Sequence, residues 1–220
     1  MEINKSAVWV FDLDDTLYSE KDYQRSGYLH IANHLKKLYQ QDVSGIIEKA
    51  DAQNKDVLQE ICYALSLPDS VKQSLLWMYR LHIPTIELTS DVKCTLAVIK
   101  SCCSAIAVIT DGRSVSQRNK LLSLGLEKID SLVSEEWGES KPGDIRFKEI
   151  ERRYPNESQY IYVGDNVKKD FITPKKMNWL TIGIRDAGNN IHSQDLSEIS
   201  EEYLPHFWIN SLSELQDYVC

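Results

Sequence analysis

Short, uninterrupted apolar runs are the main pattern in this chain. The three strongest cover residues 7–11, 105–109 and 160–163. Because their apolar residues occupy consecutive rather than alternate positions, each run is typical of a parallel strand that is covered on both faces. Weaker runs at 180–184, 131–133 and 207–209 predict three further strands, the last of them at the sheet edge.

Helical patterns separate most of these runs. Residues 145–154 place apolar side chains on one face, and three further segments carry signals of a helix start. The starts are predicted at a capping box over Ser114–Gln117, at Thr173 as N-cap with Pro174 in the first turn, and at a capping box over Ser213–Gln216. Strands that alternate with helices predict an α/β fold, a doubly wound, Rossmann-like parallel sheet.

The interval from about residue 18 to residue 90 breaks the alternation. It has no convincing strand, and apolar residues recur there at helical spacing, as in Ile31 with Leu35 and Val57 with Ile61. We therefore predict two domains. Residues 1–17 and 91–220 form the α/β core, and residues 18–90 form an inserted, all-helical cap domain.

Each of the three strongest strands leads directly into an acidic turn. The turns carry Asp12-Leu-Asp14-Asp, Thr110-Asp111-Gly112 and Gly-Asp165, the last followed by Asp170. In an open parallel sheet, ligands bind outside the carboxyl ends of the strands. A single aspartate after a strand is more often a turn or cap residue, but three such turns at one edge indicate a site.

A cluster of aspartates at one edge favours a hard divalent cation. Neighbouring carboxylates repel one another, and a cation removes that repulsion. Mg²⁺ prefers oxygen ligands and takes only one or two carboxylates, which leaves coordination positions for a phosphate oxygen. The predicted metal ligands are Asp12, Asp165 and the backbone carbonyl of Asp14.

Together with Lys141-Pro142, these turns resemble the motif set of the haloacid dehalogenase superfamily of phosphohydrolases. The four motifs occur in order and span essentially the whole chain. The resemblance implies that Asp12 attacks phosphorus to form an aspartyl-phosphate and that Asp14 is the general acid and base. It also implies that Lys141 neutralises charge on the nucleophile and the phosphate.

The resemblance assigns the remaining turn residues to the phosphate and the metal. Thr110, with Asp111 and Gly112 in the same turn, would bind the phosphoryl oxygens, although Asp111 would equally suit a role in holding the loop. Asp170 would orient a metal-bound water or Lys141 rather than contact the metal. The helical cap would close over the site and favour a small substrate.

The predicted function is therefore a Mg²⁺-dependent phosphatase that hydrolyses a small organic phosphomonoester. A sugar-phosphate mutase shares all four motifs and is the second hypothesis. A non-catalytic module that keeps the fold is a third, but Asp12 and Lys141 are intact. A receiver-like switch is a fourth, but the acid/base role of Asp14 would shorten the lifetime of its phosphoaspartate.

The composition of the chain bears on its binding partners and its location in the cell. The net charge is −8 and the lysine pairs are scattered, so nucleic-acid binding is disfavoured. No apolar run is long enough for a membrane span, no signal peptide is evident, and the cysteines show no paired spacing, which together predict a cytoplasmic protein. A homo-oligomer is left open, since exposed tryptophans such as Trp137 or Trp179 would suit an interface.

Overall fold

Six parallel strands form the core of the computed structural model, which describes residues 3, 6–192, 194–197 and 199–219. The strand order is β3-β2-β1-β4-β5-β6, so β1 lies centrally and the chain winds outward in both directions. This confirms the predicted doubly wound α/β fold, with the last strand at an edge. The strands are β1 (Ala7–Phe11), β2 (Ala105–Thr110), β3 (Asp130–Val133), β4 (Gln159–Gly164), β5 (Leu180–Ile184) and β6 (Phe207–Ile209).

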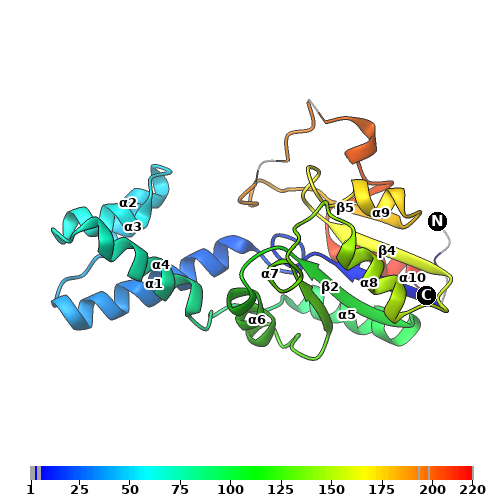
Figure 1. Ribbon diagram of the computed structural model, residues 1–220, viewed down its shortest axis with the longest axis horizontal. Coiled ribbons are helices and arrows are strands. Elements are labelled where there is room, and N and C mark those ends of the chain that lie inside the picture. Colours follow the sequence, from blue (N-terminus) through cyan, green and yellow to red (C-terminus); the bar gives the residue numbers. More distant parts are fainter. Residues whose placement is uncertain (1–2, 4–5, 193, 198, 220) are drawn as a thin grey trace.

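Both faces of the sheet are covered by helices (Figure 1). Along β1, Trp9 and Phe11 pack into one core and Val8 and Val10 into the other. This two-sided burial is the reason that the strand sequences are apolar throughout rather than alternating. The helices of the core are α5 (Ser90–Cys102), α6 (Ser114–Ser123), α7 (Ser134–Trp137), α8 (Ile145–Arg153), α9 (Ile172–Lys176) and α10 (Gln216–Val219), with short 3₁₀ turns at Glu201–Tyr203 and Leu212–Leu215.

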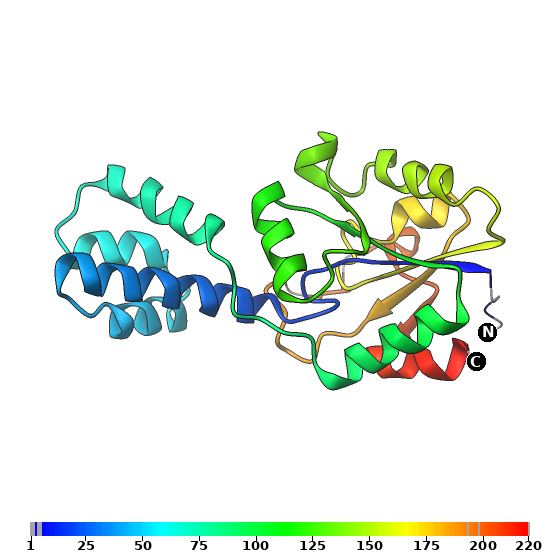
Figure 2. The same cartoon turned by 90° about the horizontal axis from the view of Figure 1, so that it is seen from below.

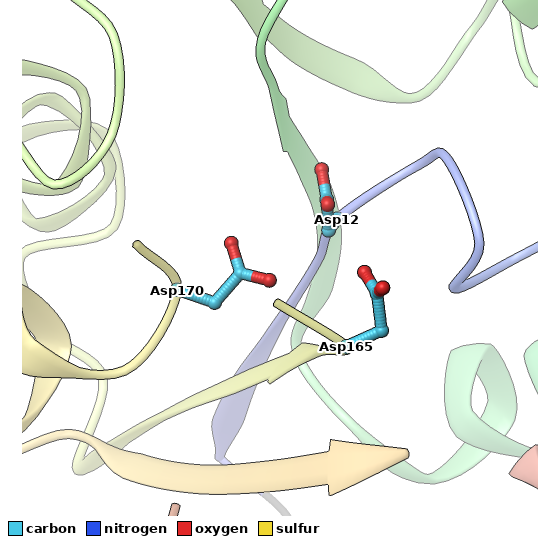
Figure 3. A group of neighbouring side chains, drawn as sticks. All are labelled: Asp12, Asp165 and Asp170. Atoms are coloured by element: carbon cyan, nitrogen blue, oxygen red, sulfur yellow. The ribbon is translucent and has the colours of Figure 1, made fainter. Parts of the chain in front are cut away.

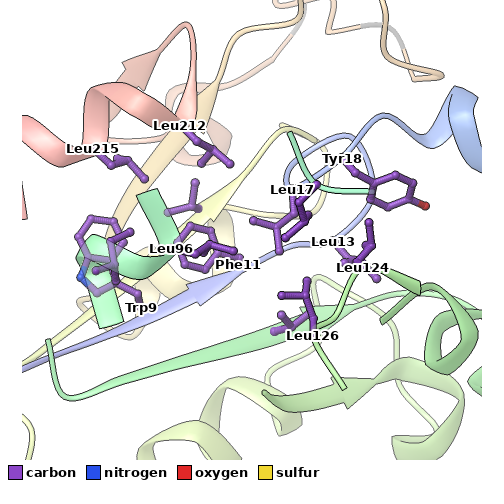
Figure 4. Close-up of a cluster of buried hydrophobic side chains, with 14 of the residues drawn as sticks. Trp9, Phe11, Leu13, Leu17, Tyr18, Leu96, Leu124, Leu126, Leu212 and Leu215 are labelled. Carbon is purple, nitrogen blue, oxygen red and sulfur yellow. The ribbon is translucent and has the colours of Figure 1, made fainter. Parts of the chain in front are cut away.

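The larger core holds the sheet against α5 and the C-terminal turns. Figure 4 shows Trp9 and Phe11 of β1 packed with Leu96 of α5 and with Leu212 and Leu215. Burying an aromatic or leucine side chain of this kind stabilises a fold by roughly 1.5–3 kcal/mol. This packing fixes the carboxyl end of β1, from which the functional turn emerges.

Residues between β1 and α5 form a separate group of helices, drawn on the left of Figures 1 and 2. The helices are α1 (Glu20–Tyr39), α2 (Ser44–Ala52), α3 (Val57–Ala64) and α4 (Asp69–Leu81). They bury their own apolar cluster, which includes Ile31 and Leu35 of α1 and Val57 and Ile61 of α3. The helical character of the insertion is as predicted, whereas its role as a cap domain and the domain boundaries stay predictions.

The three predicted helix starts are wrong in detail. Helix α6 begins at Ser114, so Arg113 rather than Ser114 is the N-cap; no side-chain cap is formed there, and the Ser114 N–H donates to Glu135. Helix α9 begins one residue before Thr173, whose hydroxyl donates to the carbonyl of Pro142. The C-terminal capping box is formed by Ser211 with Glu214, two residues earlier than predicted. In the first two cases the side chain makes a tertiary contact, and in the third a neighbouring serine forms the capping box.

Trp179 also differs from the prediction, since it is only 1% exposed. Its ring stacks on Tyr160 with centroids 5.0 Å apart, and its indole N–H donates to Glu151 at 2.9 Å. It therefore belongs to the core and offers no surface for an interface. Within the described residues, no helix combines the length and the apolar character needed to cross a membrane.

Candidate active site

Three buried aspartates meet at the carboxyl ends of β1 and β4 (Figure 3). Asp12 directly continues β1, and its main-chain N–H donates to the carbonyl of Val163 at 2.9 Å. Asp165 follows β4, and Asp170 lies one turn further on. One carboxylate oxygen from each aspartate lies within 4.8 Å of the others. The sheet register thus brings together residues more than 150 positions apart in the sequence.

Lys141 provides a positive charge beside this cluster. Its Nζ lies 2.8 Å from Asp12 Oδ1 and 2.7 Å from Asp170 Oδ1, and it donates to the Tyr162 hydroxyl at 2.9 Å. The Lys141 side chain is completely buried. The predicted role of Asp170, to orient Lys141, is compatible with this geometry.

The charges of this cluster do not balance. Burial raises the pKa of Asp12 to about 6 despite the attraction of Lys141. Burial, together with the charges of Asp170 and Asp12, raises the pKa of Asp165 to about 8. Three buried carboxylates that share one ammonium form an oxygen donor set suited to a hard divalent cation, which would supply the missing positive charge.

A glycine allows Asp170 to reach this position. A Cβ built on Gly164 would lie 2.6 Å from Asp170 Oδ2, which is too close for any side chain. The same Oδ2 accepts a hydrogen bond from the main-chain N–H of Asn166 at 2.8 Å. The Gly164-Asp165 turn therefore packs directly against the carboxylate that holds Lys141.

The Asp14 carboxylate belongs to a different network. Lys120 Nζ donates to Asp14 Oδ1 at 2.7 Å, and Gln117 Nε2 donates to Oδ2 at 2.8 Å. The Tyr18 hydroxyl makes a third short hydrogen bond to Oδ1. Burial alone would raise the pKa of Asp14, but Lys120 and these hydrogen bonds outweigh it and lower the pKa below its ordinary value.

Gln117 and Lys120 were not predicted as site residues. Both lie on the buried face of α6, at positions that continue the spacing of Leu121 and Leu124. Polar side chains on an otherwise apolar helix face were the available signal. The Gln117 side chain packs against the second acidic turn at Gly112, where φ is +149° and there is no side chain. A Cβ at this position would lie 2.6 Å from Gln117 Nε2.

The second acidic turn is held by charged side chains from the core. The Asp111 carboxylate accepts a hydrogen bond from the main-chain N–H of Lys141 at 3.1 Å and pairs with Arg146 at 2.6 Å. Arg146, a fully buried residue that we did not predict, also donates to the carbonyl of Thr110 at 2.8 Å. Asp111 thus holds the loop, the second of its two predicted roles.

Two groups in this turn differ in their availability to a phosphate. The main-chain N–H of Gly112 donates to Ser134 Oγ at 2.9 Å, so it is already engaged. Among the described residues, none offers a hydrogen-bond partner to the buried hydroxyl of Thr110. A ligand oxygen would satisfy this hydroxyl, whereas phosphate binding by all three turn residues stays a prediction.

A loop after β5 completes the site and had no sequence signal. Asn190 Nδ2 donates to Asp165 Oδ2 at 2.8 Å, and the main-chain N–H of Ile191 donates to Asp15 Oδ2 at 2.9 Å. Gln194 Nε2 donates to the carbonyl of Asp165 at 2.8 Å. The loop therefore ties the first and third acidic turns together.

These turns enclose a small polar cavity of about 100 Å³. It brings together four of the predicted acidic residues with polar groups that were not predicted, among them Glu20, Asn166, Lys169 and His192. The lining residues are Asp12, Asp14, Asp15, Glu20, Asp111, Asp165, Asn166, Lys169 and His192.

Residues 9–184 match the family model of the haloacid dehalogenase-like hydrolases. The chain belongs to this family. The matched residues include the turns after β1, β2 and β4. The match therefore confirms the resemblance on which the predicted site rests.

Two curated relatives of this hydrolase are phosphatases. A glyceraldehyde 3-phosphate phosphatase from Methanocaldococcus jannaschii is 29% identical and covers 96% of this chain and 95% of its own length. A protein of the same name from Methanopyrus kandleri is 31% identical over 59% of this chain and 55% of its own. With the family match, they confirm the prediction of a phosphomonoester hydrolase.

Solved structures share the whole fold of the hydrolase at low sequence identity. The haloacid dehalogenase-family hydrolase YfnB of Bacillus subtilis, solved with magnesium bound, has a TM-score of 0.64 at 20% identity and covers 97% of this chain and 98% of its own. A 2-haloacid dehalogenase from Pseudomonas syringae has a TM-score of 0.62 at 20% identity, with 97% of each chain covered.

Proposed function

We propose that this hydrolase is a Mg²⁺-dependent phosphatase that cleaves a small organic phosphomonoester through an aspartyl-phosphate on Asp12. The observation that carries the proposal is the buried cluster of Asp12, Asp165 and Asp170 with Lys141 between two of them. A cation with oxygen ligands and a fixed ammonium are the groups that a carboxylate needs in order to approach a phosphate dianion.

In the first step, a carboxylate oxygen of Asp12 forms a bond to phosphorus while the bond from phosphorus to the alcohol oxygen breaks. Lys141, 2.8 Å from Asp12, offsets the charge on the nucleophile and on the phosphoryl oxygens. The unpartnered hydroxyl of Thr110 is our candidate donor to a phosphoryl oxygen. The departing alkoxide oxygen takes up a proton from water, and the proton that Asp14 removes in the second step returns to water.

In the second step, water attacks phosphorus and the bond to Asp12 breaks, which releases inorganic phosphate. Asp14 is the candidate base that removes a proton from this water. Its lowered pKa supports the base role, because Lys120 keeps the carboxylate ionised. Its predicted second role, as the acid for the leaving alcohol, requires a proton that this arrangement disfavours.

Asp12, Asp165 and the backbone carbonyl of Asp14 are our candidate ligands for Mg²⁺. When bound, the cation would neutralise the phosphate dianion and orient it for in-line attack. Two observations support a divalent cation here: the raised pKa of Asp165 and the packing of oxygen atoms within 4.8 Å. The magnesium bound to the related YfnB supports the choice of ion.

The substrate that we would test first is glyceraldehyde 3-phosphate, because both curated relatives are named for it. A cavity of about 100 Å³ between the acidic turns accommodates a phosphoryl group, and α1 begins at its rim with Glu20. The helical insertion that follows supports a small substrate, as expected of a cap that closes over the site.

The test is phosphate release from glyceraldehyde 3-phosphate and from para-nitrophenyl phosphate, with Mg²⁺ and with EDTA, beside Asp12→Asn. We expect release that requires both the metal and Asp12. Asp217→Asn, on the distant helix α10, is the matched control and should keep full activity. Metal-independent release, or an active Asp12→Asn, would contradict the proposal.

A further inference from the structure

Glu20 lines the catalytic cavity without a role in the proposed chemistry. It is the first residue of α1, and its main-chain N–H donates to Asp15 Oδ1 at 2.8 Å, which fixes the start of the helix at the site. Among the residues that the structure describes, none makes a hydrogen bond or an ion pair with the Glu20 carboxylate. An acidic group without a direct ion pair therefore lines the same cavity as the proposed nucleophile Asp12.

Three lysines beside the carboxylates of the cavity are already paired. Lys169 lies 3.5 Å from Asp111, Lys141 lies 2.8 Å from Asp12 and 2.7 Å from Asp170, and Lys120 lies 2.7 Å from Asp14. Asn166 and His192 provide polar edges that can hydrogen-bond a hydroxyl or a carbonyl. A substrate carboxylate beside Glu20 would have to compete with an aspartate for each of these three lysines.

We propose that Glu20 is a specificity-determining residue that rejects substrates with an anionic group besides the phosphate. The site therefore takes phosphate esters of neutral alcohols, such as aldehyde, polyol and sugar phosphates. This inference rests on the proposed phosphatase function and names the substrate class of that site.

The electrostatic environment of Glu20 supports this selection. Burial, together with the charge of Asp14, raises the pKa of Glu20 to about 7, so a negative charge is already unfavourable at this position. A carboxylate on a bound ester would add a further negative charge to the same surroundings. At the separations within so small a cavity, repulsion between two such charges amounts to about tenfold in specificity or more.

A purely structural role for Glu20 makes a different prediction. An acidic residue in the first turn of a helix stabilises the helix through its dipole, and Asp22 in the same turn shares this property. Asp22 pairs with Arg25 at 3.4 Å and is outside the cavity lining. Asp22→Asn is therefore a matched control that removes the same charge from the same turn.

The experiment compares two substrates that share one carbon skeleton. Glyceraldehyde 3-phosphate and 3-phosphoglycerate differ by an aldehyde against a carboxylate, and the ratio of their kcat/KM values is measured with Mg²⁺ at pH 8, where Glu20 is ionised. We expect the wild type to favour the aldehyde and Glu20→Gln to shift the ratio toward the carboxylate by about tenfold. Glu20→Asp and Asp22→Asn should keep the wild-type ratio.

An unchanged kcat/KM ratio in Glu20→Gln would overturn the assignment. An equal shift in Asp22→Asn would also overturn it, because the shift would then arise from the net charge of the protein rather than from Glu20. Calorimetric binding of the same two esters to Asp12→Asn, with and without Glu20→Gln, gives the discrimination without turnover. Absence of phosphate release from any ester would then count against the proposed function, while the ratio of the two dissociation constants would still decide the role of Glu20.

Discussion

Asp12 and Asp14 are two residues apart, and each contacts a buried lysine, yet their environments have opposite effects. Lys141 is shared between Asp12 and Asp170, and burial raises the pKa of Asp12 to about 6. Among the described residues, Lys120 forms an ion pair with one carboxylate, that of Asp14; Tyr18 and Gln117 are further donors, and together they outweigh burial and lower the pKa of Asp14. The pKa values of the two carboxylates therefore differ because of the ratio of positive to negative charge around each, rather than because of burial itself.

This difference in charge balance suits the two networks to different roles. The Asp12 network has surplus negative charge and is stable only when a cation is added, which is the property of a metal site. The Asp14 network is balanced without a ligand, which is the property of a positioned base. Substitutions that change one network and leave the other intact test this difference.

The largest effect is expected from Asp12→Asn. Removal of the nucleophile should lower kcat by at least about a thousandfold. Lys141 keeps its contact with Asp170, and repulsion from Asp165 is relieved, so we expect the melting temperature of the metal-free protein to stay the same or to rise. Steady-state kinetics and thermal melting measure the two outcomes, and a marked loss of stability would contradict the surplus of negative charge.

Asp14→Asn should lower kcat by about a hundredfold or more through loss of the base. Unlike Asp12→Asn, it leaves Lys120 buried without a counter-charge, which should lower the free energy of unfolding by about 3 kcal/mol. The double variant Asp14→Asn/Lys120→Met should regain most of that stability but no activity. Urea unfolding of the single and double variants tests this, and equal stability of Asp12→Asn and Asp14→Asn would remove the contrast.

The stability of the metal-free protein should depend on pH through Asp12 and Asp165. Their folded-state pKa values, about 6 and about 8, lie above the ordinary value of 3.8, so the folded state binds more protons in this range. Stability therefore falls as pH rises from about 4 to about 8, by on the order of a few kcal/mol. Mg²⁺ should stabilise the protein more at pH 8 than at pH 5.

Asp165→Asn should remove most of this pH dependence and weaken the stabilisation by Mg²⁺. Melting curves with MgCl₂ and with EDTA at the two pH values provide the measurement. Asp91→Asn, an exposed residue in the first turn of α5, is the control and should behave as the wild type. An unchanged magnesium titration in Asp165→Asn would remove this residue from the proposed ligands.

The smallest effect is expected from Lys120→Met on the pH profile of kcat/KM. Loss of the ammonium leaves burial to raise the pKa of Asp14, so that Asp14 joins Asp12 in setting the acid limb of the profile, which should move by about one unit to higher pH. Lys120→Arg should keep the limb near its original position. Lys128→Met, on the surface, is the control, and a profile that does not move would exclude Asp14 as the group that sets this limb.

Patterns along the chain predicted the scaffold better than the site. All six strands were predicted because two-sided burial leaves a direct trace in consecutive apolar residues such as Val8–Phe11. The convergence of Asp12 and Asp165 followed from the parallel sheet, since adjacent strands end at the same edge. These features depend on local pattern and topology.

The second network could not be predicted in the same way. Lys120 meets Asp14 across 106 positions of sequence, and its helix face gives only the weak signal of polar residues at buried positions. Ser114 had the sequence form of a capping residue, but its hydroxyl donates to Glu136 instead. Asn190 and Ile191 lie in a loop without periodicity, so only the folded chain shows that they contact the acidic turns.

The most direct test of the central claim is the intact mass of Asp14→Asn after incubation with glyceraldehyde 3-phosphate and Mg²⁺. With the nucleophile present and the base removed, the account predicts a protein heavier by one phosphoryl group, labile to hydroxylamine and located by peptide mapping on Asp12. The adduct should be absent in EDTA and in Asp12→Asn/Asp14→Asn. A phosphoryl group on another residue, or turnover by Asp14→Asn at the wild-type rate, would contradict the division of roles between the two aspartates.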